Sequence, residues 1–293
     1  MTLEQLYRQG SERLSQSGVE NASVDGRYLL MEVFGMTLAS LLAVKDQELP
    51  ENEETGERCR RYKELIEKRA MRIPLQYLIG IQSFMGYDFY VNEHVLIPRQ
   101  DTETLVELAL KENPSGECSL LDVCTGSGCI AISLALKGGY RQVTALDLSE
   151  EALKVAGRNA EALLGDDKGC VTLVKSDMFE SLPQGSKFDL IVSNPPYIRS
   201  SVIDRLEPEV SWHEPRMALD GAEDGLKFYR ILAKKCKDYL KPGGCVYVEI
   251  GYDQRLQVEA LFQAQGYERI RTVKDMAGQD RVVRADWIGQ QQE

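Results

Sequence analysis

The strongest restriction on the fold of this chain is an alternation of apolar runs and helical stretches from Thr102 onward. Each run has the length and the content of β-branched residues that are typical of a buried strand. The clearest runs are Leu120–Asp122, Gln142–Asp147, Val171–Val174 and Phe188–Ser193. Strands that alternate with helices form mostly parallel sheets with helices on both faces. We therefore predict an α/β fold with a doubly wound, mostly parallel sheet.

The residues before this region have a different pattern. Residues 1–73 show apolar side chains at helical spacing and include a long charged helix, predicted from Glu51 to Ala70. Residues 74–97 alternate aromatic and polar side chains, which predicts a short β-hairpin. We therefore divide the chain into a helical domain at 1–73, a β-hairpin linker at 74–97 and an α/β domain at 98–293.

The tetrapeptide Asn194-Pro195-Pro196-Tyr197 directly follows the predicted strand Phe188–Ser193. It lies at the carboxyl end of a parallel strand, where α/β sheets usually bind ligands. Proline fixes φ and lacks an N–H, so the segment is stiff and its carbonyls are free to accept hydrogen bonds. The side-chain oxygen of Asn194 and the carbonyl of Pro195 can receive both N–H bonds of a planar NH2 group, with the Tyr197 ring over its face. For the two prolines alone, a strand-ending turn is the simpler interpretation.

A glycine-rich turn upstream favours a ligand site over a simple strand-ending turn. It follows the strand ending at Asp122, and Gly126 and Gly128 allow a nucleotide-like ligand to approach the main chain. Asp147 ends the next strand, where a carboxylate suits the two hydroxyls of a ribose. The same glycines also fit the NAD fingerprint or a turn without a ligand. Asp147 is also compatible with a helix N-cap before Ser149.

The carboxylate of Asp122 helps to decide which cofactor the glycine-rich turn binds. A pyrophosphate needs unblocked N–H groups at a helix N-terminus, whereas Asp122 stands where it can face a positive charge. That arrangement suits the amino acid portion of S-adenosylmethionine. Because the Asn-Pro-Pro-Tyr turn follows the fourth strand, beside this loop, a methyl donor and an amide acceptor would be neighbours.

Together these residues resemble the class I S-adenosylmethionine-dependent methyltransferases that act on planar nitrogens. Within that class the chain resembles the HemK-type enzymes, which methylate a glutamine side chain in peptide chain release factors. The resemblance runs from about residue 70 to residue 284 through an ordered series of motifs: Pro74-Leu75-Gln76-Tyr77-Leu78-Ile79-Gly80, Phe84-Met85-Gly86, Val95-Leu96-Ile97-Pro98-Arg99, Asp101-Thr102-Glu103, Glu214-Pro215-Arg216, Glu249-Ile250-Gly251 and Val273-Lys274-Asp275-Met276-Ala277-Gly278. Gln100 replaces the family's usual proline, and we expect only a small effect on the local turn.

The resemblance implies a seven-stranded sheet with an antiparallel hairpin at its edge, S-adenosylmethionine as cofactor, S-adenosylhomocysteine as product, and no metal. It implies cofactor contacts from Asp122, Cys124, Thr125, Gly126, Ser127, Gly128, Asp147, Asp177, Met178 and Asn194. It implies substrate contacts from Asn194, Pro195, Pro196, Tyr197 and Glu214. Asn194, Pro195 and Tyr197 are then the catalytic residues.

The implied reaction is methyl transfer to the side-chain amide nitrogen of the glutamine in the Gly-Gly-Gln motif of release factors. Methylation of a glutamine in a ribosomal protein, or of the amino group of a nucleic-acid base, can use the same device. A dehydrogenase would instead bind NAD, and a non-catalytic binding module would bind cofactor without transferring a methyl group.

Composition bears on partners and location. The net charge of −11 disfavours nucleic acid as the substrate, because phosphate contacts dominate nucleic-acid affinity. Seven cysteines without a Cys-x-x-Cys pair and only two histidines favour a reducing cytoplasm and disfavour a metal site. The first twenty residues lack a basic start followed by an apolar stretch, and no apolar run reaches membrane-spanning length. We therefore expect a cytoplasmic protein without a membrane segment. We also expect a monomer, although the composition does not bear on the oligomeric state.

Overall fold

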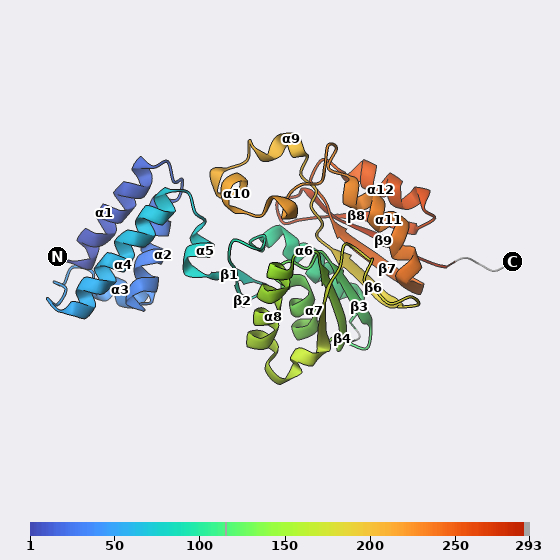
Figure 1. Ribbon diagram of the computed structural model, residues 1–293, viewed down its shortest axis with the longest axis horizontal. Coiled ribbons are helices and arrows are strands. Elements are labelled where there is room, and N and C mark those ends of the chain that lie inside the picture. The colour runs from blue at the N-terminus through green and yellow to red at the C-terminus, as the bar shows by residue number, and fades with distance from the viewer. Residues whose placement is uncertain (115, 290–293) are drawn as a thin grey trace. The chain divides into compact units, whose positions relative to one another are not determined.

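The computed structural model describes residues 1–114 and 116–289, so the last four residues of the predicted α/β domain lie outside it (Figure 1). It divides into two compact units. The first comprises residues 1–80 together with Glu207–His213, and the second comprises residues 81–206 and those from 214 onward. The division falls inside the predicted linker. Nothing in the sequence indicated that Glu207–His213 joins the first unit.

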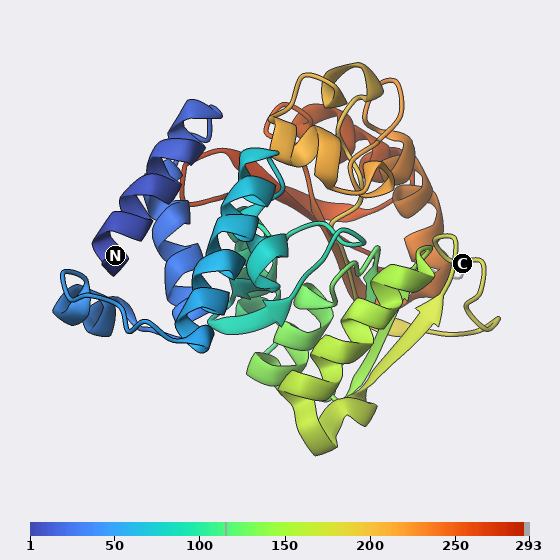
Figure 2. The ribbon, with the colours of Figure 1, turned by 60° about the vertical axis from the view of Figure 1, so that its left-hand side comes forward.

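The first unit is helical. Its helices are α1 (Leu3–Gln16), α2 (Ala22–Phe34), α3 (Leu38–Val44), α4 (Glu53–Ala70), α5 (Leu75–Ile79) and α10 (Pro208–His213). The N-cap Thr2 begins α1 through a reciprocal capping box with Gln5, and Asn52 caps α4. Figures 1 and 2 show α1, α2 and α4 packed side by side, which the contacts between them also establish. They enclose a core that includes Leu6, Leu14, Leu29, Leu30, Tyr62 and Leu65.

Helix α10 is held in this unit by a chain of ion pairs. The buried Arg69 of α4 donates to Asp25 of α2 at 2.7 Å and to Glu209 of α10 at 2.7 Å. Arg72 also pairs with Glu209, at 2.6 Å. Against the effect of burial, hydrogen bonds from both arginines lower the pKa of Glu209 to about 2. Because a buried charge is costly without a partner, this network ties the α10 segment to α2 and α4.

The second unit begins with the antiparallel hairpin of β1 (Ile81–Phe84) and β2 (Tyr87–Tyr90). Helix α6 (Gln100–Glu112) follows it. Gln100 is the first residue of α6, a position where proline is favoured but not required. With glutamine at this position, α6 still begins at residue 100.

A seven-stranded sheet forms the centre of this unit, with the order β5-β4-β3-β6-β7-β9-β8. Its strands are β3 (Ser119–Val123), β4 (Gln142–Asp147), β5 (Val171–Lys175), β6 (Phe188–Ser193), β7 (Leu240–Glu249), β8 (Glu268–Lys274) and β9 (Asp280–Asp286). The first five strands pair in parallel, and β9 pairs antiparallel with both β7 and β8. The predicted doubly wound sheet with an antiparallel edge hairpin is confirmed.

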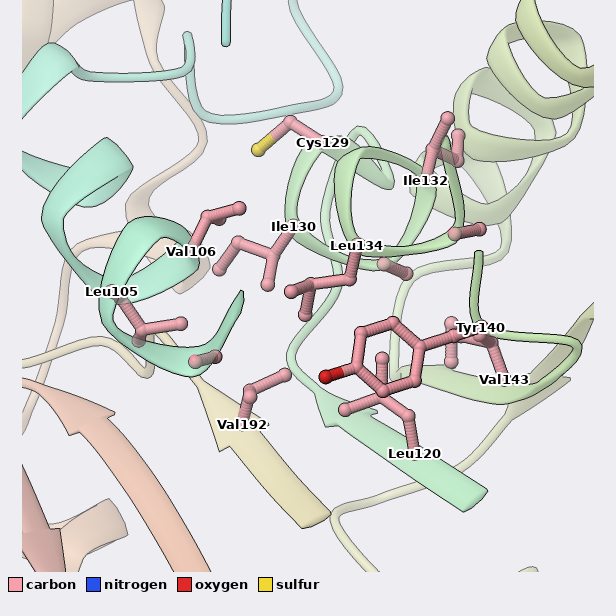
Figure 3. Close-up of a cluster of buried hydrophobic side chains, with 14 of the residues drawn as sticks. Leu105, Val106, Leu120, Cys129, Ile130, Ile132, Leu134, Tyr140, Val143 and Val192 are labelled. Carbon is pink, nitrogen blue, oxygen red and sulfur yellow. The ribbon is translucent and has the colours of Figure 1, made fainter. Parts of the chain in front are cut away.

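Helices cover both faces of the sheet. They are α7 (Cys129–Gly138), α8 (Glu150–Leu164), α11 (Lys227–Tyr239) and α12 (Arg255–Ala264), with α6 beside α7 and the short α9 (Ser200–Ile203) after β6. Leu120 joins the core cluster that contains α6 and α7 side chains, whereas its neighbour Leu121 joins the cluster with α11 and α12. Figure 3 shows the first cluster, where Val106 and Ile130 meet Val192. Both faces of the strands are therefore apolar and buried, as doubly wound sheets require.

Within the described residues, no single helix has the length and apolar character to cross a membrane. Helices α2 and α3 meet the criterion of length and composition only as a pair that is bent by 89°.

The ion-pair network of the first unit leads to a stability prediction. Arg69→Ala leaves the buried Asp25 unpaired and should lower the free energy of unfolding by about 3–5 kcal/mol. Arg13→Ala breaks the exposed pair of Arg13 with Glu67 and should cost less than about 1 kcal/mol. Hydrogen exchange of the α2 and α4 amides would measure both values. Equal losses in the two variants would contradict the assigned role of Arg69.

Candidate functional site

A pocket of about 460 Å³ lies at the carboxyl ends of β3, β4 and β6. Strands β3 and β6 flank the point where the order of the sheet reverses, because the chain runs outward from β3 to β5 and then returns to β6. The predicted site residues that line the pocket are Cys124, Thr125, Gly126, Ser127, Asp147, Asp177, Met178, Asn194 and Pro196. The sheet thus brings most of the predicted cofactor set together with Asn194.

The two glycines of the turn after β3 have different roles. Both have positive φ, +56° at Gly126 and +80° at Gly128. A Cβ on Gly126 would meet no atom within 4 Å, so this backbone borders open pocket. A Cβ on Gly128 would lie 2.9 Å from Ile132 and 3.2 Å from Ala156. Gly126 therefore leaves room for a ligand against the main chain, whereas Gly128 allows α7 to pack on α8.

Asp147 lines the pocket and stabilises this turn. Its Oδ2 accepts from the Gly126 N–H at 2.8 Å, and its Oδ1 accepts from the Ser149 N–H at 2.9 Å. The N-cap of α8 is Ser149, which accepts from the Ala152 N–H, so the N-cap interpretation of Asp147 is wrong. A carboxylate offers about four acceptor positions. Asp147 can therefore hold the turn and still accept hydrogen bonds from ligand hydroxyls.

Asp122 is placed differently from its prediction. It is fully buried beneath the turn and does not line the pocket. Its Oδ2 accepts from the Thr125 hydroxyl at 2.6 Å, and its Oδ1 has no hydrogen-bond partner among the described residues. Burial raises the pKa of Asp122 to about 7. Thr125 lines the pocket, so it lies between this carboxyl and the pocket space.

Two further pocket residues adopt a backbone conformation that the sequence did not indicate. Cys124 and Met178 have φ of +65° and +50°, the left-handed region that non-glycine residues rarely occupy. Their sulfur atoms lie 3.8 Å apart. Such conformations concentrate at functional sites, because only the surrounding structure holds them in place. Asp177, between strand β5 and Met178, is exposed on the pocket rim.

The Asn-Pro-Pro-Tyr turn contributes unequally to the pocket. Asn194 and Pro196 line it, whereas Pro195 is buried and Tyr197 is outside the lining. The Tyr197 ring packs against the second core cluster, and its hydroxyl donates to Glu249 Oε1 at 3.2 Å. In this arrangement Tyr197 supports the turn from behind. Its predicted contact with the flat face of an amide stays a prediction.

Glu214 is also outside the lining. It is buried and accepts at 2.5 Å from Arg99, which does line the pocket. Glu214 thus holds Arg99 on the pocket wall, and its predicted contact with the substrate stays a prediction.

Sequence reasoning missed Thr102 and Glu249 as site residues. Thr102 lines the pocket from α6 and accepts from Asn194 Nδ2 at 3.2 Å. Glu249 is buried at the end of β7 and accepts from Tyr197. Both residues belong to motifs that the chain shares with the HemK-type family. That resemblance was the only indication in the sequence, and it did not say what either residue does.

The described residues contain no group of three or more His, Cys, Asp or Glu side chains that could hold a metal ion.

The raised pKa of Asp122 predicts a pH-dependent stability. An aspartate titrates at about 3.9 in an unfolded chain, so the folded state binds the Asp122 proton more tightly and loses stability as pH rises from about 4 to about 7. Asp122→Asn removes this loss. Its melting temperature relative to wild type should increase between about pH 5 and pH 7 and then level off. A constant difference in thermal melts across this range would contradict the assignment.

Comparison with known proteins agrees with this geometry. The family models described as PrmC N-terminal domain and Methyltransferase small domain match residues 5–80 and 100–206. A release factor glutamine methyltransferase of Geobacter sulfurreducens is 43% identical over 270 residues, which cover 92% of this chain and 91% of that protein. The release factor glutamine methyltransferase of Caulobacter vibrioides is 42% identical over 284 residues, covering 97% and 96%. The crystal structure of a methyltransferase from Pyrococcus furiosus matches with a TM-score of 0.54 at 20% identity, covering 76% of this chain and 99% of that one, and supports the fold. This chain therefore belongs to the release factor glutamine methyltransferase family.

Proposed function

We propose that this protein transfers a methyl group from S-adenosylmethionine to the side-chain amide nitrogen of the glutamine in the Gly-Gly-Gln motif of peptide chain release factors. The observation that carries the proposal is the position of Asn194. It stands at the end of β6, on the same pocket as the glycine-rich turn after the neighbouring strand β3. An amide acceptor held by Asn194 is therefore adjacent to a cofactor held by that turn.

The residues of the pocket fit S-adenosylmethionine. Asp147 retains acceptor capacity for ribose hydroxyls, and the backbone at Gly126 borders open space. The buried Oδ1 of Asp122 and the Oγ of Ser127 have no hydrogen-bond partner among the described residues, which suits a polar, cationic ligand nearby. When bound, S-adenosylmethionine supplies an electrophilic methyl group on a sulfonium centre.

The protein's own contribution is to position the acceptor. A carboxamide nitrogen is a poor nucleophile, because its lone pair is delocalised into the carbonyl, and an ordinary general base cannot readily deprotonate it. The Asn194 side-chain oxygen and the Pro195 carbonyl accept its two hydrogens, fix its orientation and increase its electron density. The nitrogen becomes acidic once it carries the methyl group, and it then releases a proton to water.

The first unit is the proposed recognition domain for the release factor. Its helices α2 and α3 expose the large apolar side chains Val24, Tyr28, Leu38 and Leu42. Exposed apolar groups at helical spacing are suited to contact with another protein.

All seven cysteines are free thiols, which supports a reducing cytoplasmic location like that expected for translation factors.

The test is methyl transfer from labelled S-adenosylmethionine to a purified release factor. Label should appear on the factor with an intact Gly-Gly-Gln glutamine and should be absent when that glutamine is replaced. Asn194→Ala should lower the rate by about two to four orders of magnitude, because it removes a positioned acceptor.

Calorimetry with S-adenosylmethionine provides the control. Asn194→Ala loses one predicted cofactor contact but keeps the glycine-rich turn and Asp147, so it should still bind the cofactor. Label on a ribosomal protein or on RNA, with none on the release factor, would overturn the substrate assignment. Affinity for NAD without methyl transfer would overturn the reaction itself.

A further inference from the structure

The proposed role of Asn194 requires its carboxamide to point in one direction. The oxygen must face the acceptor amide, yet the oxygen and nitrogen ends of the group have nearly the same shape. A turn that holds Asn194 only by its backbone would permit both orientations. Presenting the nitrogen would place two donors against the two donors of the substrate amide. Some neighbouring group must therefore select the orientation.

Thr102 supplies a suitable partner. Asn194 Nδ2 donates to Thr102 Oγ1 at 3.2 Å, and Thr102 is itself 2% exposed. A hydroxyl can accept and donate together, so accepting from Nδ2 leaves the Thr102 proton available for another acceptor. If that proton is directed elsewhere, the Thr102 oxygen presents a lone pair to Asn194. The amide nitrogen is then drawn towards α6, and Oδ1 is left for the pocket.

The buried Glu249 carboxyl group is the candidate acceptor for the Thr102 proton. Glu249 is 1% exposed, its Oε1 accepts from Tyr197, and its buried Oε2 has no formed hydrogen bond among the described residues. Burial raises the pKa of Glu249 to about 7, and its interaction with the Thr102 hydroxyl is the strongest influence that lowers it. A hydrogen bond from the Thr102 hydroxyl would satisfy Oε2.

Arg281 offsets part of the effect of burial on Glu249. Arg281 of β9 is buried beside it, pairs with Asp275 at 3.0 Å and Asp101 at 3.2 Å, and its charge lowers the pKa of Glu249. The Tyr229 hydroxyl of α11 donates at 2.9 Å to the main-chain oxygen of Glu249, not to its carboxylate. The carboxyl group is thus left to Tyr197, which donates to it, and to Thr102, which accepts from Asn194.

We propose that Thr102 and Glu249 are positioning residues that orient the Asn194 carboxamide, with every donor in the series pointing towards the Glu249 carboxylate. Asn194 Nδ2 donates to Thr102, and Thr102 donates to Glu249. The same carboxylate anchors Tyr197, three residues after Asn194, so it holds the turn at both ends. This proposal rests on the proposed function and adds the residues that give Asn194 its direction.

Three variants test the direction of the series. Thr102→Val keeps the shape but removes the hydroxyl, and Glu249→Gln replaces an acceptor by a group that can donate to Thr102. Each should lower kcat for release factor methylation by about 10- to 100-fold with a much smaller change in KM, because misplacement of a reacting group acts on the rate. Thr102→Ser retains the hydroxyl and should restore most of kcat.

Thr272→Val is the matched control. Its hydroxyl donates to Glu259 at 2.6 Å, the same chemical pair, but neither residue lines the pocket. This variant should keep wild-type kcat. An equal loss of kcat in Thr272→Val and Thr102→Val would overturn the proposal, because it would show a general effect of losing a threonine–glutamate hydrogen bond.

A second readout does not depend on turnover. In protein labelled with 15N-asparagine, the side-chain amide signal of Asn194 is identified by its loss in Asn194→Ala. It should shift in Thr102→Val and in Glu249→Gln, and stay in place in Thr102→Ser and Thr272→Val. An unshifted signal in the first two variants, or their full kcat, would overturn the positioning role. Failure of the wild-type protein to methylate the release factor would instead overturn the proposed function, while the amide signal would still decide the orientation of Asn194.

Discussion

The site depends on the parallel pairing of β3 with β6. In this register Val123 lies opposite Ser193, and the Ser193 hydroxyl donates to the Val123 carbonyl at 2.7 Å across 70 residues of sequence. Both strands end at the same edge, so the glycine-rich turn and Asn194 emerge side by side. Without this pairing the two halves of the site would be unrelated turns. The buried core on both faces of the sheet is what makes the register specific, because a one-residue slip would expose it.

Two buried carboxyl groups lie behind the pocket. Asp122 lies beneath the glycine-rich turn and Glu249 lies beneath the Asn-Pro-Pro-Tyr turn, each with one oxygen lacking a hydrogen bond among the described residues. Burial raises the pKa of each to about 7. Groups of this kind reduce stability and concentrate at functional sites. Each is associated with a threonine that does line the pocket: Thr125 donates to Asp122, and Thr102 is the proposed donor to Glu249. At these two places the pocket wall presents a threonine hydroxyl, and a carboxyl group lies one layer behind it.

Much of the fold followed from local patterns. The predicted strands Gln142–Asp147 and Phe188–Ser193 coincide with β4 and β6, because continuous apolar runs that end in polar turns define buried strands at both ends. The role of Asp147 was harder to predict, because a carboxylate just before Ser149 is also compatible with a helix N-cap. Only the position of the Gly126 N–H, brought close by the turn after β3, shows that Asp147 is committed to the pocket and Ser149 to the helix.

The sequence by itself determined the doubly wound sheet, the two turns at its edge and the position of Asn194 directly after a strand, because these depend on local periodicity, proline and glycine. Tertiary structure alone decided which side chains reach the pocket. It buried Asp122, turned Tyr197 towards Glu249, and brought Thr102 to Asn194. It also placed Glu209 on Arg69 and Arg72 of the helical unit. These contacts join residues far apart in the chain. The periodic pattern of apolar residues does not indicate which buried polar groups will be in contact in the folded protein.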